Sequence, residues 1–166
     1  MERLWSPWRS QYVSQAPEAD AGCIFCRFAR DQDNVPNLVA YRGEHAYVVL
    51  NRFPYNAGHL MIVPYQHTSE FASLPPETLS DLMSLMGLCL GALQDAFGPD
   101  GYNTGMNLGS VAGAGIADHL HLHVVPRWAG DTNFMPVLAD IKVMPELLQE
   151  SYDKLAAALK RRADGG

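Results

Sequence analysis

Three histidines stand at alternate positions in the stretch His119-Leu-His-Leu-His-Val-Val, and they are half of the six histidines in this chain. Imidazole is a competent nucleophile and proton carrier near neutral pH. The intervening leucines and valines favour a β-strand, on which His119, His121 and His123 would project from one face. Imidazoles buried side by side repel when protonated and need partners when neutral. The pattern therefore indicates a functional face rather than ordinary core.

The spacing of the triad limits what it can bind. On a strand, successive histidines are about 6.6 Å apart and the outer pair about 13 Å apart. A zinc–nitrogen bond is only about 2 Å long, so one ion could take an adjacent pair but hardly all three. The three histidines must therefore divide their roles.

A glycine-rich segment, "GSVAGAG", comes directly before the triad. Taken alone it could be an ordinary strand connection. Its glycines, Gly109, Gly113 and Gly115, let backbone N–H groups approach phosphate oxygens. Beside three imidazoles, this predicts nucleophilic attack on phosphorus.

The pair Cys23-Ile-Phe-Cys26 supplies half of a tetrahedral zinc site, whose other ligands would be histidines brought close by folding. The alternative is a reduced thiol pair that merely packs. Three cysteines are too few, and odd in number, for a disulfide framework. Cys89 lies on an apolar helical stripe and is expected in the core.

Charge and hydropathy exclude several classes of protein. Twelve basic and eighteen acidic residues give a net charge of −6, which argues against a broad basic surface for nucleic acid. No apolar run approaches the roughly 20 residues of a membrane span, and the N-terminus has no apolar leader segment. We expect a cytoplasmic protein.

The pattern along the chain predicts a single α+β domain, residues 1–166, with helices packed on a mostly antiparallel sheet. Strands are expected at 37–41, 45–50, 59–64, 102–108 and over the triad. The apolar spacing predicts a long helix over 79–97, ended by "GPDG", and a C-terminal helix over about 144–161. Residues 1–35 form an irregular or partly helical arm carrying the cysteine pair, in which Trp5, Trp8 and Tyr12 share one helix face. The apolar side of the long helix is expected to include Leu79, Leu82, Met83, Met86, Cys89, Leu90, Leu93 and Phe97; that of the C-terminal helix, Met144, Leu147, Leu148, Leu155 and Leu159.

The triad resembles the signature of the histidine triad (HIT) superfamily of nucleotide hydrolases and transferases. "VLNRFPYNAGHLMIVP" is similar to the family's upstream strand pair, and "VVPRWAGD" to the continuation found in the fragile-histidine-triad branch. "LWSPWRSQYV", "NLGSVAG" and "GDTNF" resemble bacterial members that split diadenosine tetraphosphate. The resemblance spans residues 4–148. It implies a HIT-like fold, with one long and one C-terminal helix on a mostly antiparallel sheet.

The resemblance also implies roles for single residues. His121 would be the nucleophile that carries a nucleotidyl group, with His59 and His123 near the α-phosphate. Asn51 would contact the ribose or a phosphate, and Asn107 the bridging oxygen. The glycine turn, including Gly113 and Gly115, would bind the nucleotide. Family members often have serine or threonine near position 115, so a main-chain N–H would have to replace that hydroxyl here.

For the cysteine pair, the resemblance implies a structural zinc site completed by His67 and His119. His119 would then anchor, His121 react and His123 orient, with no metal needed in the chemical step. His45 has no assigned role and is expected at the surface. Trp128 could stack on a base or on a neighbouring subunit, or pack in the core.

The leading interpretation is a homodimeric enzyme that cleaves dinucleoside polyphosphates at the α-phosphate, with water or phosphate as the acceptor. The alternatives are a purine nucleoside phosphoramidate hydrolase using the same residues, and a non-catalytic, zinc-stabilised nucleotide-binding module.

Overall fold

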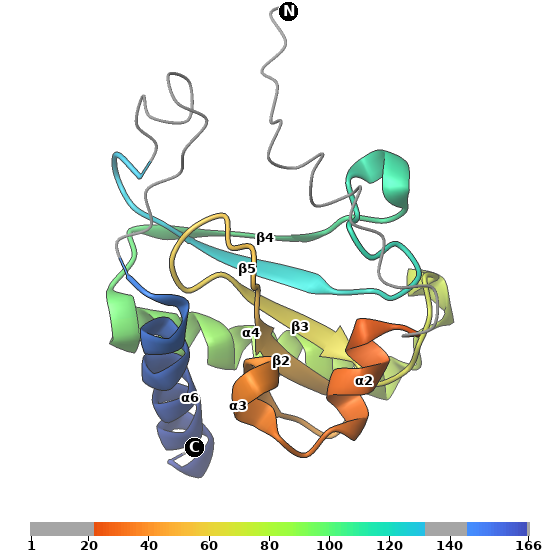
Figure 1. Cartoon of the computed structure of the whole chain (residues 1–166), viewed down its shortest axis with the longest axis horizontal. Coiled ribbons are helices and arrows are strands. Elements are labelled where there is room, and N and C mark those ends of the chain that lie inside the picture. Colours follow the sequence, from red (N-terminus) through yellow and green to blue (C-terminus); the bar gives the residue numbers. More distant parts are fainter. Residues whose placement is uncertain (1–21, 132–145, 166) are drawn as a thin grey trace, which may run out of the picture.

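The centre of the computed structural model, which describes residues 22–131 and 146–165, is a five-stranded antiparallel sheet (Figure 1). The strands lie in the order β1-β2-β3-β5-β4. This arrangement confirms the predicted α+β fold and mostly antiparallel sheet. The strands are β1 (Val39–Arg42), β2 (Ala46–Leu50), β3 (Leu60–Pro64), β4 (Gly101–Met106) and β5 (Leu122–Arg127).

The last strand in the chain, β5, lies between β3 and β4, so it collects segments that are distant in sequence. His123 on β5 pairs with Met61 on one side and with Gly105 on the other. The loop between β2 and β3 and the segment after β4 are thereby brought to the histidines. β4 is an edge strand of the sheet.

The two faces of β5 have different surroundings. Leu122 and Val124 belong to the buried core, where helix α4 (Pro76–Phe97) covers the sheet. His123, Val125 and Arg127 alternate with them and therefore project from the opposite face. The histidine face is thus the one that α4 leaves uncovered.

The long helix α4 confirms the predicted one and begins three residues earlier, at a proline that favours the first helical turn. It ends at Gly98, whose φ of 54° suits a glycine at this position. Cys89 is fully buried, as expected, and burial raises the pKa of its thiol. The prediction was wrong for Met83, which is 50% exposed, whereas Leu85 is buried. Leucine and methionine occur on several sides of this helix, so their spacing alone could not predict which residues at the border of the apolar face are buried.

Helix α2 (Ile24–Arg30) lies on the histidine face and confirms that the N-terminal arm is partly helical. It buries Phe25 and Phe28, and the ring of Phe25 contacts those of His119 and His121. The short helix α3 (Asn34–Asn37) leads into β1. The predicted helix face of Trp5, Trp8 and Tyr12 lies outside the described residues.

The C-terminal helix α6 (Leu148–Asp164) packs against α4 and β1. It starts later than the predicted residue 144 and ends three residues beyond 161; Met144 lies outside the described residues. Leu147 was wrongly predicted on the apolar side and is 71% exposed. Leu147 precedes the first residue of α6. The neighbouring Glu146 accepts hydrogen bonds from Ser151 and Lys154 of α6, which hold residues 146–147 over the start of the helix. None of the helices in these described ranges is long and apolar enough to cross a membrane.

Candidate functional site

Two cysteines and two histidines from three separate segments meet beside helix α2. Cys23 and Cys26 come from the start of α2, His67 follows β3, and His119 precedes β5. Their sulfur and nitrogen atoms all lie within 4.8 Å of one another. The structure therefore brings together all four predicted metal ligands, and this group could hold a metal ion.

The separations of these atoms fit a tetrahedral ion. His67 Nδ1 and His119 Nδ1 are 3.2 Å apart; the sulfur–nitrogen distance is 3.3 Å for Cys23 and His119, 3.3 Å for Cys26 and His67, and 3.6 Å for Cys26 and His119. Zinc bonds of about 2.3 Å to sulfur and about 2.0–2.1 Å to nitrogen give tetrahedral edges of about 3.6 and 3.3 Å. Burial, and then the neighbouring Cys23, raise the pKa of Cys26. A bound cation would offset that penalty on the thiolate.

The ring of His119 is fixed for this role by its other nitrogen. His119 Nε2 lies 2.9 Å from the carbonyl oxygen of Pro64. A carbonyl can only accept, so Nε2 carries the proton and Nδ1 presents its lone pair to the cysteines. The side chain is fully buried, and burial lowers its pKa. His119 is therefore held as a neutral ligand.

His121 has the opposite arrangement. Its Nδ1 donates to the carbonyl oxygen of His119 over 2.9 Å, so in the neutral ring Nε2 carries the lone pair. The residue is 6% exposed, and burial lowers its pKa. A neutral imidazole with a fixed tautomer and an unprotonated Nε2 is suited to nucleophilic attack.

His59 and His123 form a second fixed pair. The backbone N–H of Tyr55 donates to His59 Nδ1 over 3.1 Å, so His59 carries its proton on Nε2. His59 Nε2 lies 2.9 Å from His123 Nδ1 and therefore donates to it, which leaves the His123 proton on Nε2. The rings of His121 and His123 pack edge to face with centroids 4.8 Å apart. The structure thus groups His59, His121 and His123, as predicted.

The predicted strand over the triad was partly wrong, because β5 begins only at Leu122. Two interactions replace strand pairing ahead of it. The N–H of Leu120 donates to the Thr68 carbonyl, and the His119 carbonyl accepts from the His121 ring. A side-chain hydrogen bond of this local kind competes with a regular ladder.

The predicted nucleotide-binding residues surround the histidines. Asn51 Nδ2 lies 3.4 Å from His59 Nδ1, and its Oδ1 accepts from the N–H of Phe53. Asn107 Nδ2 lies 3.5 Å from the carbonyl of Gly113. The Gly113 N–H donates to Ser110 within the turn, whereas Gly115 is exposed beyond it. The φ angles of 83° at Gly109 and 92° at Gly113 explain why glycine occupies these positions.

A cavity of about 390 Å³ adjoins His123 on the side of β4. Its lining includes Tyr55, Asn103, Gly105, Asn107, Val125 and Arg127. Sequence reasoning assigned no role to Tyr55, Asn103 or Arg127. Tyr55 and Arg127 lie in "VLNRFPYNAGHLMIVP" and "VVPRWAGD", two segments whose resemblance to the family implied no role for either residue.

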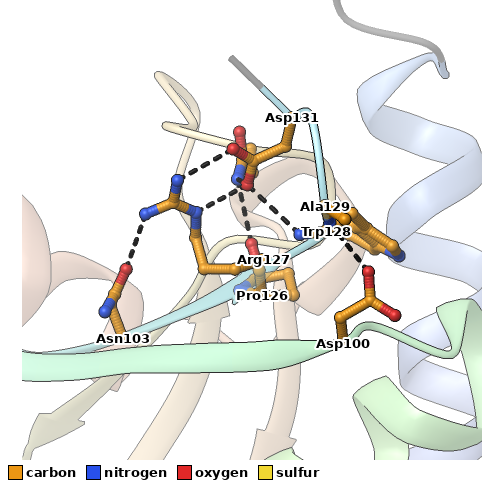
Figure 2. A network of polar contacts seen from close by, with 8 residues as sticks. Asp100, Asn103, Pro126, Arg127, Trp128, Ala129 and Asp131 are labelled. Atoms are coloured by element: carbon orange, nitrogen blue, oxygen red, sulfur yellow. Dashed lines mark hydrogen bonds and ion pairs between the residues drawn. The ribbon is translucent and has the colours of Figure 1, made fainter.

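The far wall of this cavity is held by a charged network (Figure 2). Arg127 donates to both carboxylate oxygens of Asp131, at 2.5 and 2.8 Å, and to Asn103 Oδ1 at 2.7 Å. Asn56 Nδ2 donates to Asp131 and to the Pro126 carbonyl, which ties the β2–β3 loop to the end of β5. The Arg127 guanidinium holds the pKa of Asp131 well below its ordinary value. The Trp128 ring points away from this pair (Figure 2).

The comparisons with known proteins agree with this geometry. Residues 32–130 match the model of the HIT domain family. The AP-4-A phosphorylase of Mycobacterium tuberculosis is 38% identical over 98% of this chain and 86% of that protein. A zinc-bound histidine triad family protein from Mycobacterium smegmatis superposes with a TM-score of 0.70, at 28% identity over 87% of this chain and 98% of that one. The diadenosine triphosphate hydrolase of Plasmodium falciparum, 16% identical, shares the fold with a TM-score of 0.60 over 77% of this chain and 78% of that one. This chain therefore belongs to the HIT family.

Proposed function

We propose that this protein is a nucleotidyl hydrolase or transferase that cleaves dinucleoside polyphosphates at the α-phosphate through a covalent intermediate on His121. The observation that carries the proposal is the arrangement of His121, whose Nδ1 donates to the His119 carbonyl and whose Nε2 is left with its lone pair. The 38% identity to a protein named AP-4-A phosphorylase supports the choice of substrate.

In the first step, His121 Nε2 forms a bond to the α-phosphorus while the bond from phosphorus to the bridging oxygen breaks. The bridging oxygen keeps the electron pair and departs as a terminal phosphate oxygen, and His123 Nε2–H is the donor proposed to hydrogen-bond to it. With diadenosine tetraphosphate, AMP remains on His121 and ATP leaves. Splitting one difficult displacement into two easier ones is the general advantage of covalent catalysis.

In the second step, an oxygen of water or of inorganic phosphate attacks the same phosphorus and the nitrogen–phosphorus bond breaks. Water loses a proton to the solvent and gives AMP; phosphate gives ADP. The electron pair of the broken bond returns to His121 Nε2. The donors proposed around the phosphate oxygens are Asn107, the N–H of Gly115 and, once the turn opens, that of Gly113. Asn51 is proposed to contact the ribose or a phosphate.

We propose zinc as the metal at Cys23, Cys26, His67 and His119, with a structural role. Two thiolates and two imidazoles form a donor set typical of closed structural zinc sites. When bound, the ion would hold α2 against the segments before β5 and after β3, and every proton and bond in the reaction is handled by other residues. The zinc-bound relative from M. smegmatis is consistent with this choice.

We also propose a homodimer. Strand β4 lies at the sheet edge, and the exposed residues Asn103 and Thr104 lie on it. An edge strand offers unpaired N–H and C=O groups to a second copy of the chain. Light scattering of the purified protein measures this directly, and a monomeric mass at working concentration would refute it.

The first test is the product spectrum from diadenosine tetraphosphate, with and without inorganic phosphate. ADP and ATP that appear only with phosphate establish phosphorolysis; AMP and ATP regardless of phosphate establish hydrolysis. Rapid acid-free quenching and mass spectrometry of the intact protein should show an AMP adduct that is absent from His121→Ala. Equal release of AMP by His121→Ala and the parent would refute the mechanism.

The alternatives give different results in the same assay. A phosphoramidate hydrolase would cleave adenosine phosphoramidate in strong preference to the tetraphosphate. A binding module would bind AMP and turn over neither substrate. Parallel assays on both compounds therefore decide among the three functions.

A further inference from the structure

We propose that the cavity between β4, β5 and Tyr55 receives the leaving half of the dinucleotide, with its distal nucleoside toward Arg127, and that Gly105 keeps this space open. This inference rests on the proposed function, because it concerns the part of the substrate that departs when His121 attacks. The cavity of about 390 Å³ falls within the range of about 300–1,000 Å³ that is usual for small-molecule sites.

The position of the cavity relative to His121 indicates which half it receives. In phosphoryl transfer, the attacking and leaving atoms stand roughly in line on opposite sides of phosphorus. The described lining of the cavity includes His123 and Asn107 but neither His121 nor Asn51. The first two are the residues proposed at the leaving oxygen, and the last is proposed at the retained nucleotide. The cavity therefore lies on the leaving side.

The spacing of two lining residues, His123 and Arg127, suits a polyphosphate with a nucleoside at its end. His123 and Arg127 project from the same face of β5, and four residues of strand span about 13 Å. A tri- or tetraphosphate bridge that starts at His123 extends over a comparable distance. Its far end would then meet the wall formed by Arg127 and Asn103.

The chemistry of that wall favours a neutral ligand group over another phosphate. Arg127 is the one cation among the described lining residues, and Asp131 neutralises it through two hydrogen bonds. Three of the five guanidinium N–H groups donate to Asp131 and Asn103, and the other two have no acceptor among residues 22–131 and 146–165. Val125 and the Tyr55 ring add apolar area. Apolar surface with a few amide and guanidinium donors matches a nucleoside, which has a flat apolar face and polar edges.

Gly105 is the one glycine in the described lining, and its lack of a side chain leaves room beside His123. It pairs with His123, so its Cβ would stand beside that imidazole. Its φ lies outside the left-handed region, and an added Cβ would meet no atom within 4 Å. Neither backbone conformation nor packing therefore requires glycine here. A glycine inside a strand costs stability and often marks a place where a ligand approaches closely.

The test is a substitution on β4 that adds a side chain in the cavity. Gly105→Val suits a β-strand and should fold, while its side chain occupies the space beside His123. Two substrates are compared: diadenosine tetraphosphate, and adenosine 5′-phosphorofluoridate, whose leaving group is only fluoride. Both place AMP on His121. Gly105→Ala gives an intermediate size. Gly87→Val is the matched control, because Gly87 is exposed on α4, across the sheet from the histidine face, has no atom near its Cβ, and lies outside the described lining.

We expect Gly105→Val to lower kcat/KM for the tetraphosphate by about 10- to 100-fold, as overfilling a defined space does, with a smaller loss in Gly105→Ala. Cleavage of the fluoridate should stay within about 3-fold of the parent, and Gly87→Val should resemble the parent on both substrates. Retained fluoridate cleavage shows at the same time that the variant is folded.

Two results would overturn the inference. Equal losses on both substrates would mean that the space serves the retained nucleotide or the packing of another copy, and light scattering on the variant separates these causes. Unchanged cleavage of the tetraphosphate would mean that the distal half lies elsewhere. Failure of the proposed function is seen separately, because the parent protein itself would then not cleave the tetraphosphate.

Discussion

His119 and His121 lie two residues apart in the same run of alternating histidine and leucine, yet they are prepared for different chemistry. His119 donates from Nε2 to the Pro64 carbonyl and turns Nδ1 toward two thiols. His121 donates from Nδ1 to the His119 carbonyl, which leaves the lone pair on Nε2. One histidine is thus suited to hold a metal ion and the other to attack phosphorus.

The comparison shows that a carbonyl acceptor decides which nitrogen of a buried histidine can react. Both rings are buried, and burial lowers the pKa of both. The different roles proposed for them therefore do not come from different exposure or charge. They come from the main chain, which offers Pro64 to one ring and His119 to the other.

The sharpest test of this division is His121→Ala. Removing the nucleophile should lower kcat for diadenosine tetraphosphate by at least about 10³-fold. The metal ligands do not include His121, so bound zinc, measured by mass spectrometry of the metal, should remain at one ion per chain. A variant that loses zinc together with activity would show that the two histidines do not act separately.

The converse test is His119→Ala, which removes one ligand but keeps the main-chain carbonyl that orients His121. Zinc content should fall well below one ion per chain. The loss of bound metal should lower the free energy of unfolding by about 4 kcal/mol when free zinc is near 1,000 times its Kd. Thermal unfolding with and without a chelator measures this loss.

Activity provides the control for His119→Ala. If the metal is structural, the variant should retain measurable turnover at a temperature well below its Tm, because His121 keeps its hydrogen-bond acceptor. Full occupancy by zinc in this variant would contradict the proposed ligand set. Complete loss of turnover in a folded variant would contradict a purely structural metal.

The sequence predicted much of the fold, and its resemblance to the family predicted the four residues that could hold a metal ion. Apolar spacing placed α4, and turn residues such as Gly98 placed its end. The resemblance assigned Cys23, Cys26, His67 and His119 to one cluster, and the structure brings their ligand atoms together. Side-chain types in a regular pattern carry this information without coordinates.

The orientation of each imidazole could not be predicted, because it depends on main-chain groups that any residue could supply. The amino-acid sequence does not show that the Pro64 carbonyl or the Tyr55 N–H is the hydrogen-bond partner of a histidine ring. The role proposed for Gly105 could not be predicted for a related reason. Its importance lies in a side chain that is absent beside His123, and only the sheet register shows that neighbour.

At His59 the main chain orients the ring in a third way: a backbone N–H donates to the ring, where His119 and His121 each donate to a carbonyl. Because Tyr55 N–H fixes His59 as a donor to His123, His59→Gln retains a possible donor with different geometry. We expect kcat to fall by about 10- to 100-fold, toward the lower end of the roughly 10²- to 10⁴-fold that a positioned proton carrier contributes, because a donor is retained; zinc content should be unchanged. Steady-state kinetics and metal analysis check both. A parent-like kcat would show that His123 does not depend on this donor.

The smallest expected effect concerns the proposed metal site alone. It is tested through Arg42, which is neither a proposed metal ligand nor one of the histidines. The Arg42 guanidinium donates to the carbonyls of Phe28, Ala29 and Asp31 and so caps the C-terminus of α2, the helix that begins beside Cys23. Arg42→Met keeps much of the side-chain length and removes the donors, which should cost about 1–2 kcal/mol of unfolding free energy. Zinc affinity, measured by competition with a chromophoric chelator, should weaken by about 10-fold.

Turnover at saturating zinc should match the parent, because His121 is held by a different part of the main chain. A fall in that turnover would mean that α2 also positions the nucleophile, through the contact between Phe25 and His121.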